Sequence, residues 1–267
     1  MTTLTLTRPL LMIGCGNMAG AMLEGWLAAG ADPRMITVVR PSGRPPAPGI
    51  RTLTSLPEDE TPALVLLGVK PQKLGDVAPR LAPALEPETI LVSILAGTTL
   101  AALRSLFPAP RTIVKAMPNL PVSLGKGVIE LYTDTAGDSA AEVERLMAAL
   151  GRAEWFDDES LFAVASALTA AAPAYLYRFI DALAAAGEEL GLPADRSARL
   201  AAAMAEGAAL LAAQSAESPA QLARRVASRG GTTEAGLAIL DSDDALRALV
   251  LRALEASRRR GLEMAAG

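Results

Sequence analysis

The stretch LLMIGCGNMAGAML, residues 10–23, decides the fold that we expect for this chain. The apolar run Leu10 to Ile13 predicts a buried strand, and the glycines that follow predict a tight turn into a helix. The turn fits the pattern G-x-G-x-x-A. Its glycines allow the turn and the close approach of a pyrophosphate, and its alanine lets the helix pack near the strand. The stretch therefore predicts a dinucleotide site, whose residues would be Gly14, Gly16, Asn17, Met18 and Ala19.

Strand-like and helix-like segments alternate through the first part of the chain. Strands are expected at residues 10–13, 36–39, 63–69, 90–95, 111–116, 127–132 and 153–156, and helices at 18–29, 72–84, 99–106 and 138–150. This alternation predicts a doubly wound parallel sheet, whereas the later segments are long, rich in Ala and Leu, and helical. We therefore expect an α/β Rossmann domain over residues 1–156 and an all-α domain over residues 157–267.

The end of the second predicted strand indicates which dinucleotide binds. Enzymes that use NAD usually carry Asp or Glu there to bind the ribose 2′-hydroxyl. This chain instead has Arg40, Ser42 and Arg44 after Val39, and no acid. We expect Arg40 and Ser42 to hold a 2′-phosphate, so NADP(H) is preferred and NAD(H) is the alternative. The alternative is that the two arginines simply belong to a solvated loop and do not contact the cofactor.

Bulk composition excludes several function classes. The 267 residues include no histidine and one cysteine, Cys15, and the net charge is −4. A His-containing metal site, a Ser-His-Asp triad and a disulfide framework are therefore excluded, and no metal is expected. The acidic balance argues against nucleic acid as a partner. The single cysteine suits a reducing cytoplasm, where Cys15 would be structural.

A long apolar stretch covers residues 161–177. It falls short of the ~18 residues wanted for a membrane span, and Pro173 interrupts it, so we expect a buried helix and no membrane partner. The Ala/Leu-rich helices have more apolar surface than one chain can cover, which predicts a homo-oligomer.

A second informative stretch is SRGGTTEA, residues 228–235. Two glycines and two threonines open a predicted helix, where consecutive backbone N–H groups would form a small anion cradle. Taken alone, an ordinary Gly-then-Thr helix cap is the better explanation of this pattern.

Taken together, the motifs resemble the pyrroline-5-carboxylate reductase family along essentially the whole chain. They are IGCGNMAGAM, Val69-Lys70-Pro71, SILAG at 93–97, KAMPNLP at 115–121, APAY at 172–175 and SRGGTTEAG at 228–236. The resemblance implies a Rossmann domain and a helical domain that interleaves into a dimer, in some members part of a decamer. It also implies NADPH-dependent reduction of the C=N bond of 1-pyrroline-5-carboxylate, a small cyclic imino acid, to L-proline.

The resemblance also implies site residues. The substrate carboxylate would bind Ser228, Arg229, Gly230, Gly231, Thr232 and Thr233, and the Thr233 hydroxyl would bond the ring nitrogen. The cofactor would further contact Val69, Lys70, Pro71, Ala96, Gly97, Pro118 and Asn119. Because an iminium carbon is already electrophilic, positioning matters more than acid–base chemistry, so a chain without histidine can catalyse the step. Lys70 is either catalytic or a solvated lysine at a strand end.

Three departures from the family pattern lie near the expected site. Leu120 replaces a threonine, residues 169–172 read Thr-Ala-Ala-Ala instead of a Gly/Ser-rich lead, and Arg229 replaces a proline. Arg229 could pair with the substrate carboxylate or point to solvent. Two alternatives therefore stay open: a reductase of a related imino acid such as a piperideine carboxylate, and a catalytically weak NADP-binding paralogue.

Overall fold

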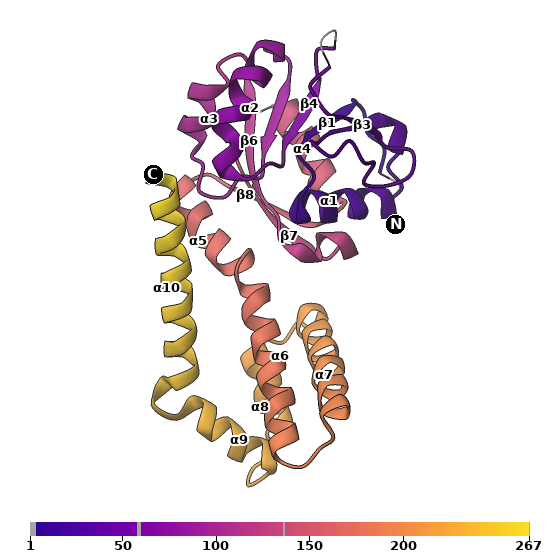
Figure 1. Ribbon diagram of the computed structural model, residues 1–267. Helices are drawn as coiled ribbons and strands as arrows, with labels where there is room; N and C mark the ends of the chain where they lie inside the picture. Colours follow the sequence, from indigo (N-terminus) through magenta and orange to yellow (C-terminus); the bar gives the residue numbers. More distant parts are fainter. Residues whose placement is uncertain (1–3, 58–59, 136, 267) are drawn as a thin grey trace. The chain divides into compact units, whose positions relative to one another are not determined.

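An eight-stranded sheet forms the centre of the first part of the chain (Figure 1). The computed structural model describes residues 4–57, 60–135 and 137–266. The strand order is β3-β2-β1-β4-β5-β6-β7-β8. The bounds are β1 Leu10–Ile13, β2 Ile36–Val39, β3 Arg51–Leu53, β4 Leu64–Leu67, β5 Ile90–Ser93, β6 Thr112–Met117, β7 Gly127–Tyr132 and β8 Gly151–Phe156. The doubly wound α/β fold is thereby confirmed.

The sheet departs from the expected all-parallel pairing at one place. β7 runs antiparallel to β6, whereas β8 is parallel to β7 and the other described neighbours are parallel. Only a loop and the 3-10 helix η4 (Leu120–Leu124) join β6 to β7. A parallel return needs a longer crossover, so this short connection reverses the strand. The sequence also failed to predict β3, a short edge strand after a Pro/Gly-rich loop.

Helices cover both faces of the sheet. On one face, α1 (Asn17–Ala28) and α4 (Asp138–Ala148) pack on a core that includes Met12 and Trp26, and the Trp26 Nε1 donates to the Leu146 carbonyl at 2.8 Å. On the other face, α2 (Leu74–Leu81) and α3 (Leu100–Leu106) cover a second core. Successive strand residues alternate between the two cores because side chains of a strand alternate between faces. The helix expected over 72–84 is α2 flanked by the 3-10 helices η2 (Pro71–Lys73) and η3 (Ala82–Ala84).

From Glu159 onward the described chain is helical, as the sequence predicts. The helices are α5 Glu159–Thr169, α6 Ala172–Glu189, α7 Ala194–Gln214, α8 Pro219–Val226, α9 Thr232–Asp241 and α10 Ala245–Ala266, with the 3-10 helix η5 at Ser242–Asp244. A capping box of Ser218 and Gln221 opens α8. Within this part α6 packs on α7, where the Ser197 Oγ donates to the Ala184 carbonyl at 2.7 Å.

The chain divides by its contacts into two compact units. The first runs to Ala171 and also includes the chain from Ser257 onward, and the second is Ala172–Ala256. α5 and the last turns of α10 thus belong with the sheet. The domain boundary expected between residues 156 and 157 stays a prediction.

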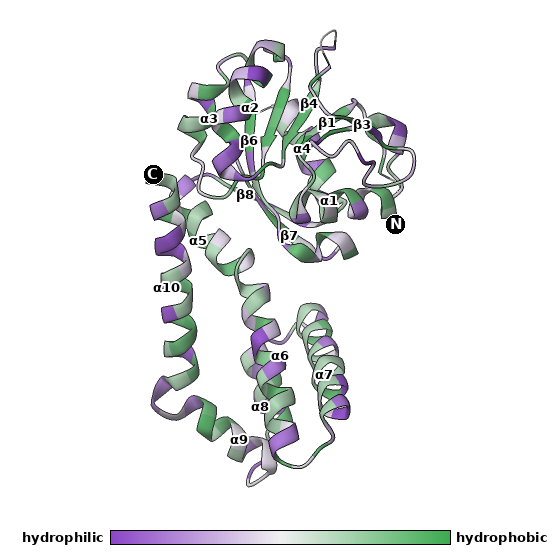
Figure 2. Ribbon diagram, viewed as in Figure 1, coloured by the Kyte–Doolittle hydropathy of each residue, from purple (hydrophilic) through white to green (hydrophobic). Residues whose placement is uncertain are grey.

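The apolar helix expected to be buried is largely exposed in the single chain. Phe162 and Ala167 of α5 are buried, but α6 has no buried residue among those described. The stretch Glu159–Glu189 is long and apolar enough to span a membrane by length and composition alone, and 11% of its most apolar window is buried. Figure 2 shows hydrophobic residues along α5 and α6. The expectation was wrong for one chain because these apolar side chains need a partner surface.

Candidate functional site

The glycine loop lies where the strand order reverses. The chain moves from β1 outward to β2 and β3, and then returns to place β4 on the other side of β1. Gly14, which follows β1, has a φ of +86°, and its N–H donates to the Val39 carbonyl at 2.8 Å. A Cβ there would meet the Gly68 carbonyl oxygen, after β4, at 2.9 Å. Only glycine fits this crossing, which is the switch point where open α/β sheets bind ligands.

The next glycine leaves open space in front of a helix. Gly16 is the N-cap of α1, and a Cβ at Gly16 would meet none of the described atoms within 4 Å. The first N–H groups of α1 therefore face a region that a side chain would otherwise fill. Ala19 is buried, and its Cβ would lie 2.8 Å from a Cβ built on Gly68. This geometry fits a dinucleotide pyrophosphate.

The residues proposed to select the cofactor follow β2. Arg40 is half-buried and Ser42 and Arg44 are exposed, and the Arg44 N–H donates to the Ser42 Oγ at 3.4 Å. Burial raises the pKa of the Cys15 thiol, and the positive charge of Arg40 lowers it in part. Arg40 thus lies close enough to the glycine loop to act on it electrostatically. Cys15 is no activated nucleophile, as expected.

The predicted contacts after β4 lie at the same edge of the sheet. Val69 and Pro71 are half-buried, and Lys70 is an exposed residue that precedes η2. The Val69 side chain reaches to 2.9 Å from a Cβ built on Gly14, so it borders the glycine loop. The position of Lys70 suits either of its two interpretations.

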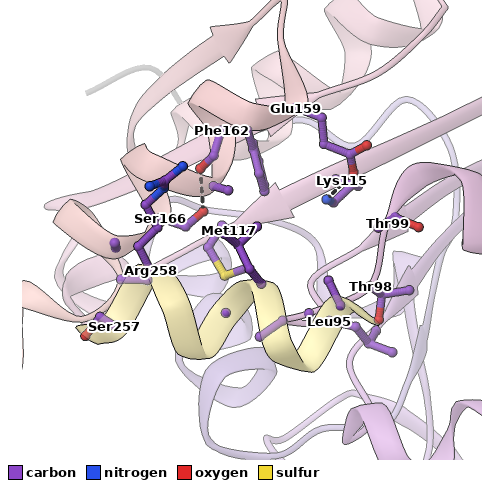
Figure 3. Close-up of a pocket in the computed structure, with 18 of the residues that line it drawn as sticks. Leu95, Thr98, Thr99, Lys115, Met117, Glu159, Phe162, Ser166, Ser257 and Arg258 are labelled. Carbon is purple, nitrogen blue, oxygen red and sulfur yellow. Dashed lines mark hydrogen bonds and ion pairs between the residues drawn. The ribbon is translucent and has the colours of Figure 1, made fainter. Parts of the chain in front are cut away.

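A cavity of about 510 Å³ opens beside the carboxyl ends of β5 and β6 (Figure 3). Its walls come from the loop after β5, from β6, from α5 and from the last turns of α10. The lining residues include Ala96, Gly97, Lys115, Met117, Ala170 and Ala171. A Cβ on Gly97 would lie 2.7 Å from the Met264 Cβ of α10, and Gly97 has a φ of +71°. Of the predicted cofactor residues, Ala96 and Gly97 line this cavity.

An ion pair that the sequence does not predict lies in the cavity wall. The Lys115 Nζ donates to the Glu159 Oε1 at 2.5 Å and lies 4.7 Å from the centre of the Phe162 ring. The same Glu159 oxygen accepts the N–H of Leu100 at 3.0 Å. Lys115 therefore ties β6 to the starts of α5 and α3. No local pattern in the sequence pairs two residues that lie 44 positions apart.

Breaking this pair is expected to cost stability. Lys115→Met should lower the free energy of unfolding by about 1–2 kcal/mol, because the Lys115 side chain is 11% exposed but Glu159 is 33% exposed and partly screened. Urea unfolding of the single and double variants with Glu159→Gln measures the coupling. Arg152→Met, which breaks the exposed pair of Arg152 with Glu154, is the control and should have little effect. Additive effects of Lys115→Met and Glu159→Gln would contradict the pairing.

Pro118 and Asn119, which directly follow β6, are buried. The Asn119 Nδ2 donates to the Thr169 carbonyl at 3.0 Å, and its Oδ1 accepts the Val128 N–H at 2.9 Å. Both ends of the amide thus bind the protein, so a cofactor contact here would use the backbone. The predicted contact stays a prediction.

The predicted substrate segment lies in the second unit. Gly231 is the N-cap of α9, Gly230 has a φ of +72°, and Arg229 is exposed. The Gly230 N–H donates to the Glu234 Oε2 at 2.6 Å, and the Gly231 N–H donates to the Ser228 carbonyl at 2.9 Å. In this conformation Glu234 occupies part of the expected anion cradle. The N–H groups of Thr232 and Thr233 start the helix, where N–H groups lack intrahelical acceptors.

The fold and the loop define a class of protein. The residues that the structure describes contain no group of three or more His, Cys, Asp and Glu side chains that could hold a metal. The switch-point loop, the open space at Gly16 and the positive charge of Arg40 define a Rossmann-type dinucleotide-binding protein.

Comparisons with known proteins narrow the class. Residues 159–264 match the family described as pyrroline-5-carboxylate reductase dimerisation, and residues 10–97 match NADP oxidoreductase coenzyme F420-dependent. The chain is 38% identical to a pyrroline-5-carboxylate reductase of Pseudomonas aeruginosa over 95% of each chain. It is 33% identical to that of Pisum sativum over 94% of each.

Solved structures agree with this assignment. The Coxiella burnetii pyrroline-5-carboxylate reductase has a TM-score of 0.85 at 31% identity, over 97% of this chain and 98% of that one. A Plasmodium falciparum pyrroline carboxylate reductase with NADP bound shares the fold, with a TM-score of 0.86 at 24% identity, over 98% and 99% of the two chains. The chain belongs to the pyrroline-5-carboxylate reductase family.

Proposed function

We propose that the protein is an NADPH-dependent oxidoreductase that acts on a CH–NH bond and reduces 1-pyrroline-5-carboxylate to L-proline. The observation that carries this proposal is the 38% identity to the Pseudomonas aeruginosa reductase over 95% of both chains. The open space at Gly16 supports it independently, because no side chain covers the first N–H groups of α1, and such N–H groups bind phosphates.

We propose that the residues around the switch point hold the cofactor, which supplies the hydride when bound. Gly14 to Ala19 would cradle the pyrophosphate, and Arg40 with Ser42 would bind a 2′-phosphate. This arrangement favours NADP(H) over NAD(H) because the strand end carries positive charge and no acid. The further contacts proposed are Val69, Lys70, Pro71, Ala96, Gly97, Pro118 and Asn119.

The substrate would be held by its carboxylate and its ring nitrogen. Residues 228–233 would bind the carboxylate, and the Thr233 hydroxyl would orient the nitrogen. Holding the ring in place is the main task of the protein, because a protonated imine needs no further activation. Lys70 is a candidate catalytic residue on the cofactor side.

We further propose that residues 157–267 act as a dimerisation and substrate-binding domain. The match of residues 159–264 to a dimerisation family supports this, as do the exposed apolar side chains of α6 and α7, which include Leu176, Phe179 and Leu211. A second copy, rather than a membrane, would cover them in a cytoplasmic homodimer, and dimers could assemble into a decamer. Sedimentation as a monomer at micromolar concentration would contradict the homodimer.

Genetic complementation tests the proposed function in a cell. A bacterial strain that lacks pyrroline-5-carboxylate reductase should grow without added proline when it expresses this chain. Expression of the Thr233→Val variant at the same level should support little growth. Failure of the wild type to restore growth, with soluble protein present, would favour a piperideine carboxylate reductase or a weak paralogue.

A further inference from the structure

Glu130 is a buried acid that the proposed mechanism does not use. It lies in β7, is 1% exposed, and faces α5. Its Oε1 contacts the Thr169 Oγ1, and its Oε2 has no hydrogen-bond partner among the residues that the structure describes. A carboxylate buried in this way would carry an uncompensated charge, which is costly in a protein interior.

The two contacts of the Thr169 hydroxyl favour the protonated form of Glu130. The Thr169 Oγ1 also lies 3.0 Å from the Ala165 carbonyl oxygen. A hydroxyl has one hydrogen, so Thr169 can donate to only one of these two oxygens. If Glu130 is protonated, it donates to the Thr169 Oγ1, and Thr169 donates to Ala165. Both contacts are then satisfied, whereas an ionised Glu130 would compete with Ala165 for the single hydrogen.

Thr169 links this acid to two parts of the candidate site. Its carbonyl, at the last turn of α5, accepts the Asn119 Nδ2, so it fixes the segment that follows β6. Ala170 and Ala171, the next residues, line the cavity. On the neighbouring strand β6, the register partner of Glu130 is Met117, which also lines the cavity. The acid thus supports the cavity without entering it.

We propose that Glu130 is a positioning residue that acts as an uncharged carboxylic acid and holds Thr169, and through it Asn119 and the cavity wall, in the geometry that binds the cofactor. The inference rests on the proposed cofactor site. Removal of the proton leaves a buried charge, and β7 and α5 must loosen to solvate it. The cofactor-binding geometry is then lost.

The surroundings of Glu130 offer no compensating cation among the described residues. On β8 its register neighbour is Glu154, which is exposed and paired with Arg152. On β6 and α5 the charged residues are Lys115 and Glu159, which pair with each other. Burial raises the pKa of Glu130 to about 8, and a backbone hydrogen bond lowers it in part.

Equilibrium titration of the full chain with NADPH at pH 7 and pH 9 tests the inference. With a pKa of about 8, roughly one molecule in eleven keeps the proton at pH 9, so the wild type should bind NADPH about tenfold more weakly than at pH 7. Glu130→Gln cannot ionise and should keep its affinity from pH 7 to pH 9. Glu154→Gln, the exposed control, should follow the wild type.

A second pair of variants keeps the test decisive if Glu130→Gln fails to fold. Thr169→Val removes the hydroxyl and should weaken NADPH binding at pH 7 to about the wild-type level at pH 9, whereas Thr169→Ser should restore it. Equal pH dependence of binding in the wild type and Glu130→Gln, or equal affinities of Thr169→Val and Thr169→Ser, would overturn the inference.

Thermal unfolding gives a readout that does not depend on the cofactor. The folded chain keeps the Glu130 proton, while the unfolded chain releases it near the ordinary pKa of 4.5. The unfolded state therefore binds fewer protons between these values, so stability must fall as the pH rises from about 4.5 to about 8. The melting temperature of the wild type should fall relative to Glu130→Gln over this range and run parallel to it above. If the melting temperatures of the wild type and Glu130→Gln instead run parallel over the whole pH range, Glu130 is not uncharged in the folded chain. A chain that binds no NADPH at any pH would instead contradict the proposed function.

Discussion

Gly16→Val is expected to abolish tight NADPH binding and to leave the fold intact. A Cβ at Gly16 meets none of the described atoms within 4 Å, and its φ of −84° and ψ of −164° suit any residue. The valine side chain would fill the space in front of α1 and keep the phosphates from the helix N–H groups. Loss of two hydrogen bonds to a charged group at ~1.5–3 kcal/mol each weakens binding by about 100-fold or more. Fluorescence titration with NADPH measures the change.

Variants of two other glycines serve as controls for the effect of Gly16→Val on NADPH binding and on stability. Gly14→Val should lower the melting temperature as well as binding, because Gly14 has a positive φ and its Cβ would meet the Gly68 carbonyl. Gly75→Ala in α2 meets none of the described atoms within 4 Å and should change neither property adversely. A folded Gly16→Val variant with wild-type affinity for NADPH would mean that the loop is not the phosphate site.

Thr233→Val is expected to lower kcat/KM for 1-pyrroline-5-carboxylate by about 100-fold, which is typical when one preorganised hydrogen-bond donor is removed. Valine keeps the shape of threonine at the start of α9 and removes only the hydroxyl proposed to orient the ring nitrogen. The affinity for NADPH should not change, because the proposed cofactor residues lie elsewhere. Steady-state kinetics with each substrate varied separate the two effects.

A conservative pair sharpens this prediction. Thr233→Ser keeps the hydroxyl and should retain most of the activity. Thr232→Val should lose far less than Thr233→Val, because valine keeps the Thr232 backbone N–H that belongs to the proposed anion cradle. If Thr233→Val and Thr233→Ser lose activity equally, the hydroxyl has no role in orienting the substrate.

Local patterns in the sequence were enough to predict the nucleotide-binding half of the fold. The apolar run before Gly14, the helical face of Met22 and Trp26, and the glycines of the turn are all neighbours along the chain. Hydrophobic periodicity and turn chemistry act over such distances, so these elements could be predicted. The same holds for the capping box that opens α8, whose partners are three residues apart.

Features that depend on distant residues could not be predicted. The direction of β7 depends on a short connection whose geometry no periodicity records, and β3 is too short to show an alternating pattern. Lys115 and Glu159 lie 44 residues apart in the sequence. Glu130 is an acid in a strand, which by itself indicates a surface position, and its burial depends on the packing of α5. The predicted burial of α6 was wrong for the single chain, because covering its apolar face needs a surface outside that chain.

The most direct test of the proposed reaction uses labelled NADPH. The purified full-length protein is incubated with 1-pyrroline-5-carboxylate and NADPH carrying deuterium on the transferred position of C4, and the product is analysed by mass spectrometry and chiral chromatography. We expect L-proline with one deuterium at C5, formed in equal amount to the NADPH consumed. The proposed function is contradicted if NADPH is not consumed with this substrate but is consumed with a piperideine carboxylate. It is also contradicted if no imine leads to consumption of NADPH.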